Sequence, residues 1–407
     1  MRFTFFVVVF ATLLLLQGCE KETQEPLPSF ESVAKSKQIV SANNEFAFSL
    51  FKKIAANEEK TNFMISPVSA SLALGMVYNG AAGETRQAFD NTLHYGDATL
   101  EETNAVNQNI IDNLTYSGSG STFKIANSIW VENTFPVKDS FTALNEKFYN
   151  AKVANMDFGD PQTLNTINNW ASDNTNGKIP TILNNIDSNS ILFAINALYF
   201  NSEWKYRFDA DRTKDLPFHG DDGLPKSVAM MTMEQNLSYY FNDTFSSVVL
   251  PYKNDKYAMT LLLPHVDKSI TDVVNIIDGD QWSQLQANFT SGNLTVTIPK
   301  FTFSYKKKLN DILKDLGLGI AFNPDLADFS ELSDVPTYIS LVLQKTYIDV
   351  NEKGTEAAAV TAVGMGVTSA GPGKPLVFDR PFLFAITEKE TGSICFIGKV
   401  GMPEYDK

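Results

Sequence analysis

The stretch Glu352-Lys353-Gly354-Thr355-Glu356-Ala357-Ala358-Ala359-Val360-Thr361 carries the most specific pattern in this chain. It follows a strand-like run at Thr346–Val350 and precedes two others at Phe382–Ile386 and Ile394–Val400. About 30 residues without an apolar face for a core therefore separate these strands. A connection longer than about 15 residues inside a compact domain is usually functional or disordered. This segment is therefore the first candidate for a functional site.

The composition of this connection differs from that of a flexible linker, because it is rich in alanine and β-branched residues. Successive side chains of a strand point to opposite faces. Glu356 would lie on one face, and the other would carry small or β-branched residues: Thr355, Ala357, Ala359, Thr361 and Val363. That face could enter a packed sheet without a clash of volume. The alternative interpretation is a loop that happens to be rich in alanine.

Working outward from this segment, hydrophobic periodicity predicts several helices. We expect a helix over residues 41–56, capped by Ser41, and a second helix that begins at Ser66-Pro67. A polar helix is expected over Asp97–Leu114 and an amphipathic one over Leu309–Leu316.

A β-branched and aromatic bias predicts strands among these helices. They are expected at Thr122–Val131, Ile191–Phe200, Val248–Leu250, Tyr257–Leu263 and Leu294–Ile298. The fold class is therefore α+β with large sheets. The absence of repeats and long linkers between residues 40 and 350 favours a single domain.

The composition excludes several classes of function. The chain has 407 residues, of which 43% are hydrophobic, so it can bury a large core. Its 33 Lys and Arg against 47 Asp and Glu give a net charge of -14, which repels nucleic acids and heparin-like polyanions. A phosphate-binding function is not expected. The run Lys306-Lys307-Lys308 is interpreted as solvated.

The residues that usually carry catalysis or bind metals are scarce. Three His and two Cys are widely scattered, so we expect neither a zinc site nor a disulfide framework. The chain has no Gly-x-Ser-x-Gly motif, no His-Glu-x-x-His motif and no phosphate-binding loop. The sequence therefore predicts no enzyme and no cofactor, and Cys395 is interpreted as a small buried hydrophobe.

The N-terminus predicts export. Arg2 precedes the apolar run Phe3–Leu16, which is too short to span a bilayer and suits a signal peptide over residues 1–18. The sequence Leu16-Gln17-Gly18-Cys19 resembles a bacterial lipobox, which predicts lipidation of Cys19, a tether over residues 19–39 and a domain over residues 40–407. The expected location is the bacterial outer membrane or cell surface. An ordinary signal peptide, giving a periplasmic or secreted protein, is the alternative.

Several blocks together resemble the serpin family. The likeness covers residues 40–404 and includes Asn62–Ser69, Asn79–Thr85, Asn196–Phe200, Met230-Met231, Leu250–Tyr252, Ile298–Phe301 and Phe378–Phe384. The resemblance implies three β-sheets, eight or nine helices and an exposed reactive-centre loop at about residues 352–375. It also implies a monomer that inhibits endopeptidases: the protease cleaves the loop, which inserts into the main sheet and traps the acyl-enzyme.

The resemblance also assigns roles to individual residues. Gly354, Thr355, Glu356, Ala357, Ala358, Ala359, Val360 and Thr361 match the hinge, whose small residues are typical of inhibitory members. Ser66, Ser69 and Asn196 match the polar shutter beneath the sheet, and Trp204 matches the breach at its top. At Gln344 many members have a His; the amide can still donate and accept hydrogen bonds there. The alternative is a non-inhibitory binding or chaperone protein whose loop is cleaved as a substrate.

The spacing usual for inhibitory members places the scissile bond between Thr368 and Ser369, with Val367 as an alternative primary residue. The surrounding residues are neutral and small to medium in size, which favours elastase-like and subtilisin-like serine proteases. Val367 could also serve papain-like cysteine proteases, and cleavage at Lys374 is expected only to consume the inhibitor. The segment that matches the family's heparin-binding helix, Leu100–Leu114, contains Glu101, Glu102 and Asp112 and no Lys or Arg, so no heparin partner is expected.

Overall fold

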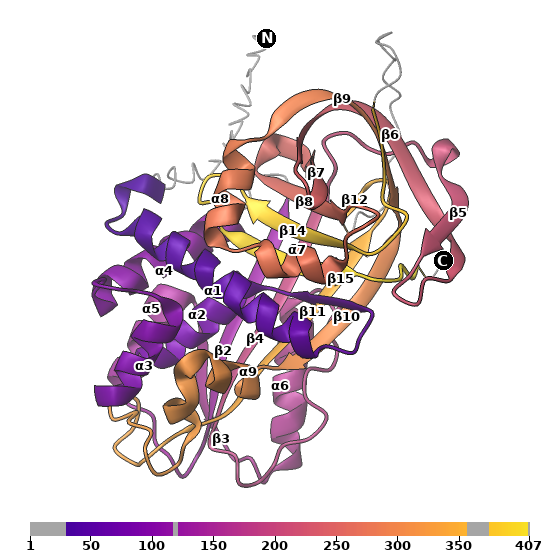
Figure 1. The fold of residues 1–407 in the computed structure, drawn as a ribbon. Helices are drawn as coiled ribbons and strands as arrows, with labels where there is room; N and C mark the ends of the chain where they lie inside the picture. The colour runs from indigo at the N-terminus through magenta and orange to yellow at the C-terminus, as the bar shows by residue number, and fades with distance from the viewer. Residues whose placement is uncertain (1–29, 117–120, 356–373, 406–407) are drawn as a thin grey trace, which may run out of the picture.

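A computed structural model describes residues 30–116, 121–355 and 374–405 of the chain (Figure 1). Within these residues it contains nine α-helices. They are α1 (Ser36–Asn57), α2 (Pro67–Tyr78), α3 (Gly83–Leu93), α4 (Leu100–Thr115), α5 (Asp139–Tyr149), α6 (Pro161–Asn174), α7 (Ile270–Ile276), α8 (Gly279–Ala287) and α9 (Asn310–Leu313). Among these residues no helix combines the length and apolar character required to cross a bilayer.

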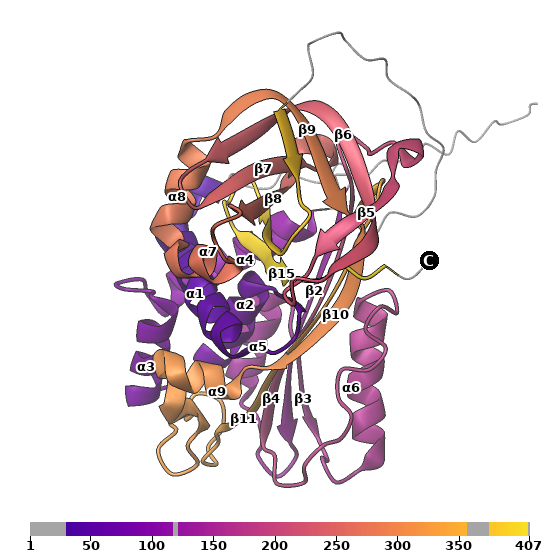
Figure 2. The same cartoon turned by 45° about the vertical axis from the view of Figure 1, so that its right-hand side comes forward.

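The first sheet has six strands in the order β10-β11-β12-β4-β2-β3. Their bounds are β2 (Thr122–Glu132), β3 (Lys152–Met156), β4 (Leu192–Glu203), β10 (Phe301–Lys308), β11 (Ile339–Val350) and β12 (Gly354–Thr355). Helix α6 packs on one face through a small core that includes Trp130, Ile167 and Phe193, and α2 contacts β4 and β2. Figure 2 shows the long strands running beside α6. Helices α6 and α2 therefore both pack against this sheet.

The remaining strands form one nine-stranded sheet. Its main path is β1-β15-β14-β8-β7-β6-β9-β13, and β5 pairs with β6. The bounds are β1 (Asn62–Ile65), β5 (Lys214–His219), β6 (Pro225–Phe241), β7 (Phe245–Pro251), β8 (Tyr257–Pro264), β9 (Thr290–Pro299), β13 (Lys374–Val377), β14 (Phe382–Glu388) and β15 (Ile394–Val400). The expected three sheets are joined into two because β6 pairs with β9 along Met230–Tyr239 and with β7 at its end.

The N-terminal helix begins earlier than the sequence predicted. Ser41 is not its cap, since α1 starts at Ser36, whose hydroxyl donates to the Phe30 and Val33 carbonyls at 2.8 and 2.7 Å. Ile39 is completely buried, so the apolar face extends into the segment interpreted as a tether. The helix predicted over residues 309–316 is confirmed in extent, since α9 continues into a π-helical turn over Lys314–Leu318, where Gly317 leaves the helical conformation with a φ of 110°.

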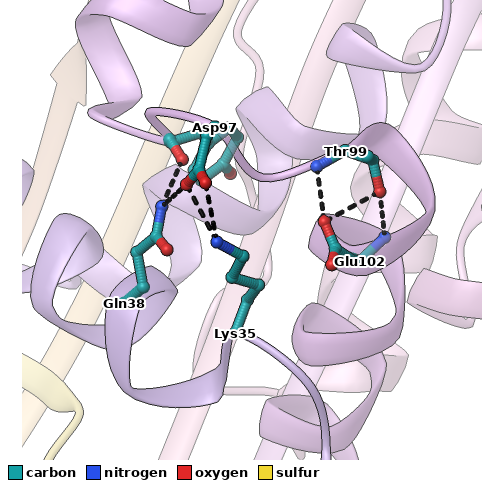
Figure 3. Close-up of polar contacts among 6 residues, drawn as sticks. Lys35, Gln38, Asp97, Thr99 and Glu102 are labelled. Atoms are coloured by element: carbon teal, nitrogen blue, oxygen red, sulfur yellow. Dashed lines mark hydrogen bonds and ion pairs between the residues drawn. The ribbon is translucent and has the colours of Figure 1, made fainter.

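The starts of α1 and α4 are held together by polar contacts (Figure 3). Both carboxylate oxygens of Asp97 accept from Lys35 at 2.9 Å, and Gln38 donates to the same side chain at 2.9 Å. Thr99 and Glu102 form a reciprocal capping box at the first turn of α4. Helix α4 therefore begins at Leu100, three residues after the predicted start.

Candidate functional site

Two strands at the centre of the six-stranded sheet pair directly only over part of their length. β11 and β4 run parallel and form a ladder from Ile339 opposite Leu192 to Lys345 opposite Ala197. Beyond Lys345 no pairing joins them among the described residues. A parallel ladder is slightly less stable per residue than an antiparallel one. The sheet thus has a central contact that an antiparallel strand could replace.

The short strand β12 occupies the upper end of this contact. Thr355 lies opposite Val350 of β11 and Ser202 of β4, and it runs antiparallel to both strands. Its side chain is only 2% exposed, and its hydroxyl shares a hydrogen bond of 2.6 Å with Tyr252. A Cβ atom at Gly354 would lie 2.1 Å from the Ser202 carbonyl oxygen, so only glycine fits there. The hinge predicted from the sequence therefore enters the sheet with its first two residues.

Aromatic rings and backbone hydrogen bonds line the entry point. The ring of Trp204 stacks on Tyr252 with centroids 4.5 Å apart, and its indole nitrogen donates to the Asn351 carbonyl at 2.9 Å. The backbone N–H of Trp204 donates to the Lys353 carbonyl at 2.8 Å. Trp204 thus lies where the sequence predicted the breach, beside the last residues before β12.

An ion pair fastens the segment just before β12. The Glu352 carboxylate lies 3.1 Å from the Lys300 ammonium and accepts from the Thr213 hydroxyl at 2.9 Å. Burial alone would raise the pKa of Glu352, but hydrogen bonds from its own backbone, Lys300 and Thr213 outweigh burial and hold that pKa below the ordinary value. Glu352 is therefore ionised, and its contacts with Lys300 and Thr213 hold the segment that leads into β12 in place.

The predicted shutter residues also lie together, below the breach. Gln344 of β11 accepts from the Ser66 backbone N–H at 2.8 Å and donates to the Ser66 carbonyl at 2.8 Å. Its amide also approaches the Ser69 hydroxyl at 3.4 Å. The amide thus uses both hydrogen-bonding functions to tie β11 to the start of α2.

The same cluster continues under β4 and β2. The Ser69 hydroxyl donates to Asn196, which donates to Asn127 at 2.6 Å, and Asn127 donates to the Tyr149 carbonyl at 3.0 Å. All of these side chains are buried. The Ser66 hydroxyl is buried without a hydrogen-bond partner among the described residues, so Ser66 acts here through its backbone.

Several predicted residues lie outside the described residues. They are Cys19, the hinge residues Glu356–Thr361, and the reactive residues Val367, Thr368 and Ser369. Lys374 begins β13, which pairs in parallel with β9; this strand was missed because Gly371-Pro372-Gly373 and Pro375 indicate a turn.

Sequence reasoning gave no role to four residues that contact the hinge, the Glu352 side chain just before it, or the shutter. They are Tyr252, Lys300, Thr213 and Asn127. Tyr252 and Lys300 do belong to two of the matched family blocks, Leu250–Tyr252 and Ile298–Phe301. The family blocks could therefore have indicated Tyr252 and Lys300 as candidates, but not that they contact Thr355 and Glu352. Cys395 is buried, as the sequence predicted, and burial raises the pKa of its thiol well above the ordinary value.

These features define an α+β protein whose main sheet holds the start of a long chain segment between two central strands. The chain matches the family model described as Serpin (serine protease inhibitor) over residues 41–403, and it belongs to the serpin family. The expected α+β serpin fold is thereby confirmed. Members of this family are in general protease inhibitors rather than catalysts.

Individual relatives agree with this assignment. An uncharacterized serpin-like protein of Methanosarcina acetivorans is 33% identical, over 98% of this chain and 96% of the relative. The leukocyte elastase inhibitor of Homo sapiens is 32% identical, over 90% of this chain and 100% of the relative. The crystal structure of the thermophilic serpin Tengpin in the native state superposes with a TM-score of 0.83 at 35% identity, over 90% of this chain and 94% of that one.

Proposed function

We propose that this serpin is a suicide inhibitor that traps endopeptidases by inserting its cleaved loop between β11 and β4. The observation that carries the proposal is β12, which already holds Thr355 between these two strands. Insertion of the reactive-centre loop as a strand is established for serpins in general. The start of such a strand is therefore in place in the uncut chain.

The register of β12 supports insertion of a specific segment. Continued antiparallel from Thr355 opposite Val350 and Ser202, the register brings Thr361 opposite both Gln344 and Asn196. These two residues now face each other directly in the β11–β4 ladder. The side chains of Ala357, Ala359, Thr361 and Val363 would then follow Thr355 onto the buried face, where their small volumes fit. Insertion would thus have to open the β11–β4 contact at the shutter and below it.

The length of the sheet agrees with the proposed scissile bond. The same register reaches Leu192, the first residue of β4, at residue 365, and Ile339, the first residue of β11, at residue 366. Cleavage between Thr368 and Ser369 would leave enough chain to fill the whole gap. In that step the protease hydroxyl attacks the Thr368 carbonyl, the amine of Ser369 leaves with a proton, and an ester remains on Thr368.

Elastase-like and subtilisin-like serine proteases are the proposed targets, with papain-like cysteine proteases as a further class addressed through Val367. The neutral residues around Thr368 support this assignment. A relative that covers nine tenths of the chain is named as a leukocyte elastase inhibitor, which also supports an elastase-like target.

The test is incubation of the purified protein with neutrophil-type elastase. We expect a complex that resists denaturant, together with a small C-terminal fragment whose sequence begins at Ser369. Quantitative loop cleavage with fully active elastase would contradict inhibition. That result would favour the alternative, a serpin-fold binding or chaperone protein. Active-site-blocked elastase is the control, since it cannot form the ester.

We further propose that the chain is exported and anchored through lipidated Cys19, at a bacterial outer membrane or cell surface. The apolar run Phe3–Leu16 and the lipobox-like Leu16–Cys19 support this location. Labelling with a fatty-acid probe should mark the wild type but not a Cys19→Ala variant. A wild-type chain that is exported without label would instead indicate a periplasmic or secreted protein.

A further inference from the structure

A cavity of about 560 Å³ lies at the lower end of the β11–β4 contact, away from β12. Its apolar floor includes Phe193 of β4 and Leu341 and Leu343 of β11. Leu341 lies directly opposite Phe193 in the parallel ladder. The cavity therefore spans the two strands that the proposed insertion would separate.

Lysines dominate the charge around this cavity. Lys306 and Lys308 of β10 and Lys314 after α9 line it, against one lining carboxylate, Asp187. Lys306 and Lys308 are two residues apart on one strand, so their side chains share a face. Neither forms an ion pair with a carboxylate within the described residues. Lys307, between them, lies on the opposite face and pairs with Glu58 at 2.8 Å.

The surroundings keep this positive charge poorly compensated. Lys345 lies opposite Lys306 in the β10–β11 ladder. Burial lowers the pKa of Lys306, and burial together with the charge of Lys306 lowers the pKa of Lys345. Lys314 is 3.3 Å from Asp311, and the Asp187 carboxylate is engaged by the Asn189 backbone N–H at 2.9 Å. Lys306 is half-buried, whereas Lys308 and Lys314 are exposed at the mouth of the cavity. The partial removal of the Lys306 ammonium group from water, without a carboxylate partner, favours a bound anion beside it.

We propose that this cavity is a binding site for a compact organic anion with two or more negative charges, such as a tricarboxylate or a phosphate ester. Lys306 and Lys308 would hold the charges, and the floor of Phe193, Leu341 and Leu343 would contact the carbon skeleton. The net charge of -14 does not oppose such a ligand. Charges beyond about 8 Å are largely screened at physiological ionic strength, so the neighbouring lysines determine the potential in the cavity.

Because of the position of the cavity, a ligand bound there would affect insertion of the loop; this inference rests on the proposed function. One wall belongs to β10 and β11, and the other belongs to β4 and the segment Leu183–Ser190 before it. Insertion of a strand between β11 and β4 would move these walls apart. A ligand that bridges them binds the uncut form better than the expanded form, and it therefore opposes insertion.

The site itself is tested on the uncut protein. Citrate and inorganic phosphate, each at 1 mM and at matched ionic strength against sodium chloride, would be compared by calorimetry and thermal unfolding. We expect one or both to bind and to raise the thermal midpoint by about 2 °C or more. A Lys306→Gln/Lys308→Gln variant should lose at least tenfold in affinity.

The matched control is Lys214→Gln/Lys226→Gln, which removes the same charge from exposed positions of β5 and β6. It should bind like the wild type. No binding of either anion, or equal binding by Lys306→Gln/Lys308→Gln, would overturn the site. A response to citrate but not phosphate would identify the ligand class as a polycarboxylate, and the reverse would identify a phosphate.

The coupling to insertion is tested on protein that has been nicked in the loop and shown to be heat-resistant. The anion should bind this form at least tenfold more weakly than the uncut form. Equal affinity for both forms would overturn the coupling while leaving the site. If the nicked protein gains no heat resistance, the proposed function fails instead, and the binding experiment on the uncut chain still decides the site.

Discussion

A side chain at residue 354 would collide with the neighbouring strand, because a Cβ there would lie 2.1 Å from the Ser202 oxygen and 2.7 Å from the Glu203 Cα. We expect Gly354→Ala to expel β12 and to lower the stability of the uncut chain by about 1–3 kcal/mol, as overpacking does. Thermal unfolding followed by tryptophan fluorescence would measure this. Gly319→Ala is the matched control, since a Cβ there meets no atom within 4 Å. Equal midpoints for both variants would contradict the proposed role of Gly354.

The ion pair between Glu352 and Lys300 should make the stability of the uncut chain depend on pH. Because its pKa is lowered in the folded chain, the stability it contributes is complete above the ordinary glutamate pKa of about 4.3 and is lost as the pH falls through the lowered value. Glu352→Gln should therefore lower the thermal midpoint most near pH 7. The difference from the wild type should begin to shrink as the pH falls below the ordinary glutamate pKa of about 4.3, and it should vanish only below the lowered pKa. A difference that stayed constant from pH 7 to pH 3 would show that charge on Glu352 is not its cause.

At the scale of the element, β12 is the part of the loop that has already joined the sheet. Thr355 is 2% exposed between β11 and β4. An arginine there would bury an unpaired charge, which costs several kcal/mol. We expect Thr355→Arg to convert the inhibitor into a substrate, so that elastase cleaves the loop and is released active.

The readout is the fraction of elastase found in denaturant-resistant complexes, which should fall at least tenfold. Thr355→Ser keeps the hydroxyl that contacts Tyr252 and serves as the control. Full trapping by Thr355→Arg would count against insertion through this position.

Gln344 of β11 forms hydrogen bonds to the start of α2. Gln344→Leu would leave the buried N–H of Ser66 without its partner. It would also remove one of the two donors to the Ser66 carbonyl, which still accepts from the Ala70 N–H at 3.1 Å. Each unsatisfied buried group costs about 1–3 kcal/mol. We expect a clearly lower midpoint in urea and a faster loss of inhibitory activity on storage.

The control for this prediction is Gln87→Leu on the exposed side of α3, which should change stability by less than about 0.5 kcal/mol. If Gln344→Leu unfolded at the same urea concentration as that control, the hydrogen bonds between Gln344 and Ser66 would make no measurable contribution to stability.

At the scale of the whole molecule, the main sheet of the uncut chain contains a parallel contact that an antiparallel strand can replace. A strand over residues 355–366 would gain hydrogen bonds on both edges and bury small side chains. We expect protein nicked between Thr368 and Ser369 to unfold more than about 10 °C above the uncut chain, which corresponds to a gain on the order of 5 kcal/mol. Differential scanning calorimetry of both forms measures this, and identical midpoints would remove the basis for trapping.

Much of this architecture could be predicted from the sequence because it depends on local patterns. The strands near Thr122–Val131 and Ile191–Phe200 follow from β-branched and aromatic runs, and the start of α2 follows from Pro67 at its first turn. The cap at Ser41 was wrong because tertiary packing set the start of α1. β13 was missed because its pairing with β9 outweighs the local turn residues.

The sequence by itself determined the α+β class, the family blocks and the small side chains of the hinge, since each is a property of neighbouring residues. Only the tertiary structure decided that Tyr252 meets Thr355, that Lys300 clamps Glu352, and that Gln344 binds Ser66 across 278 positions. It also placed Lys306 and Lys308 beside one cavity, where Lys308 is exposed, as the sequence predicted, and Lys306 is half-buried. The physical reason is that partners far apart in the chain are chosen by how strands and helices pack, and no local periodicity carries that information.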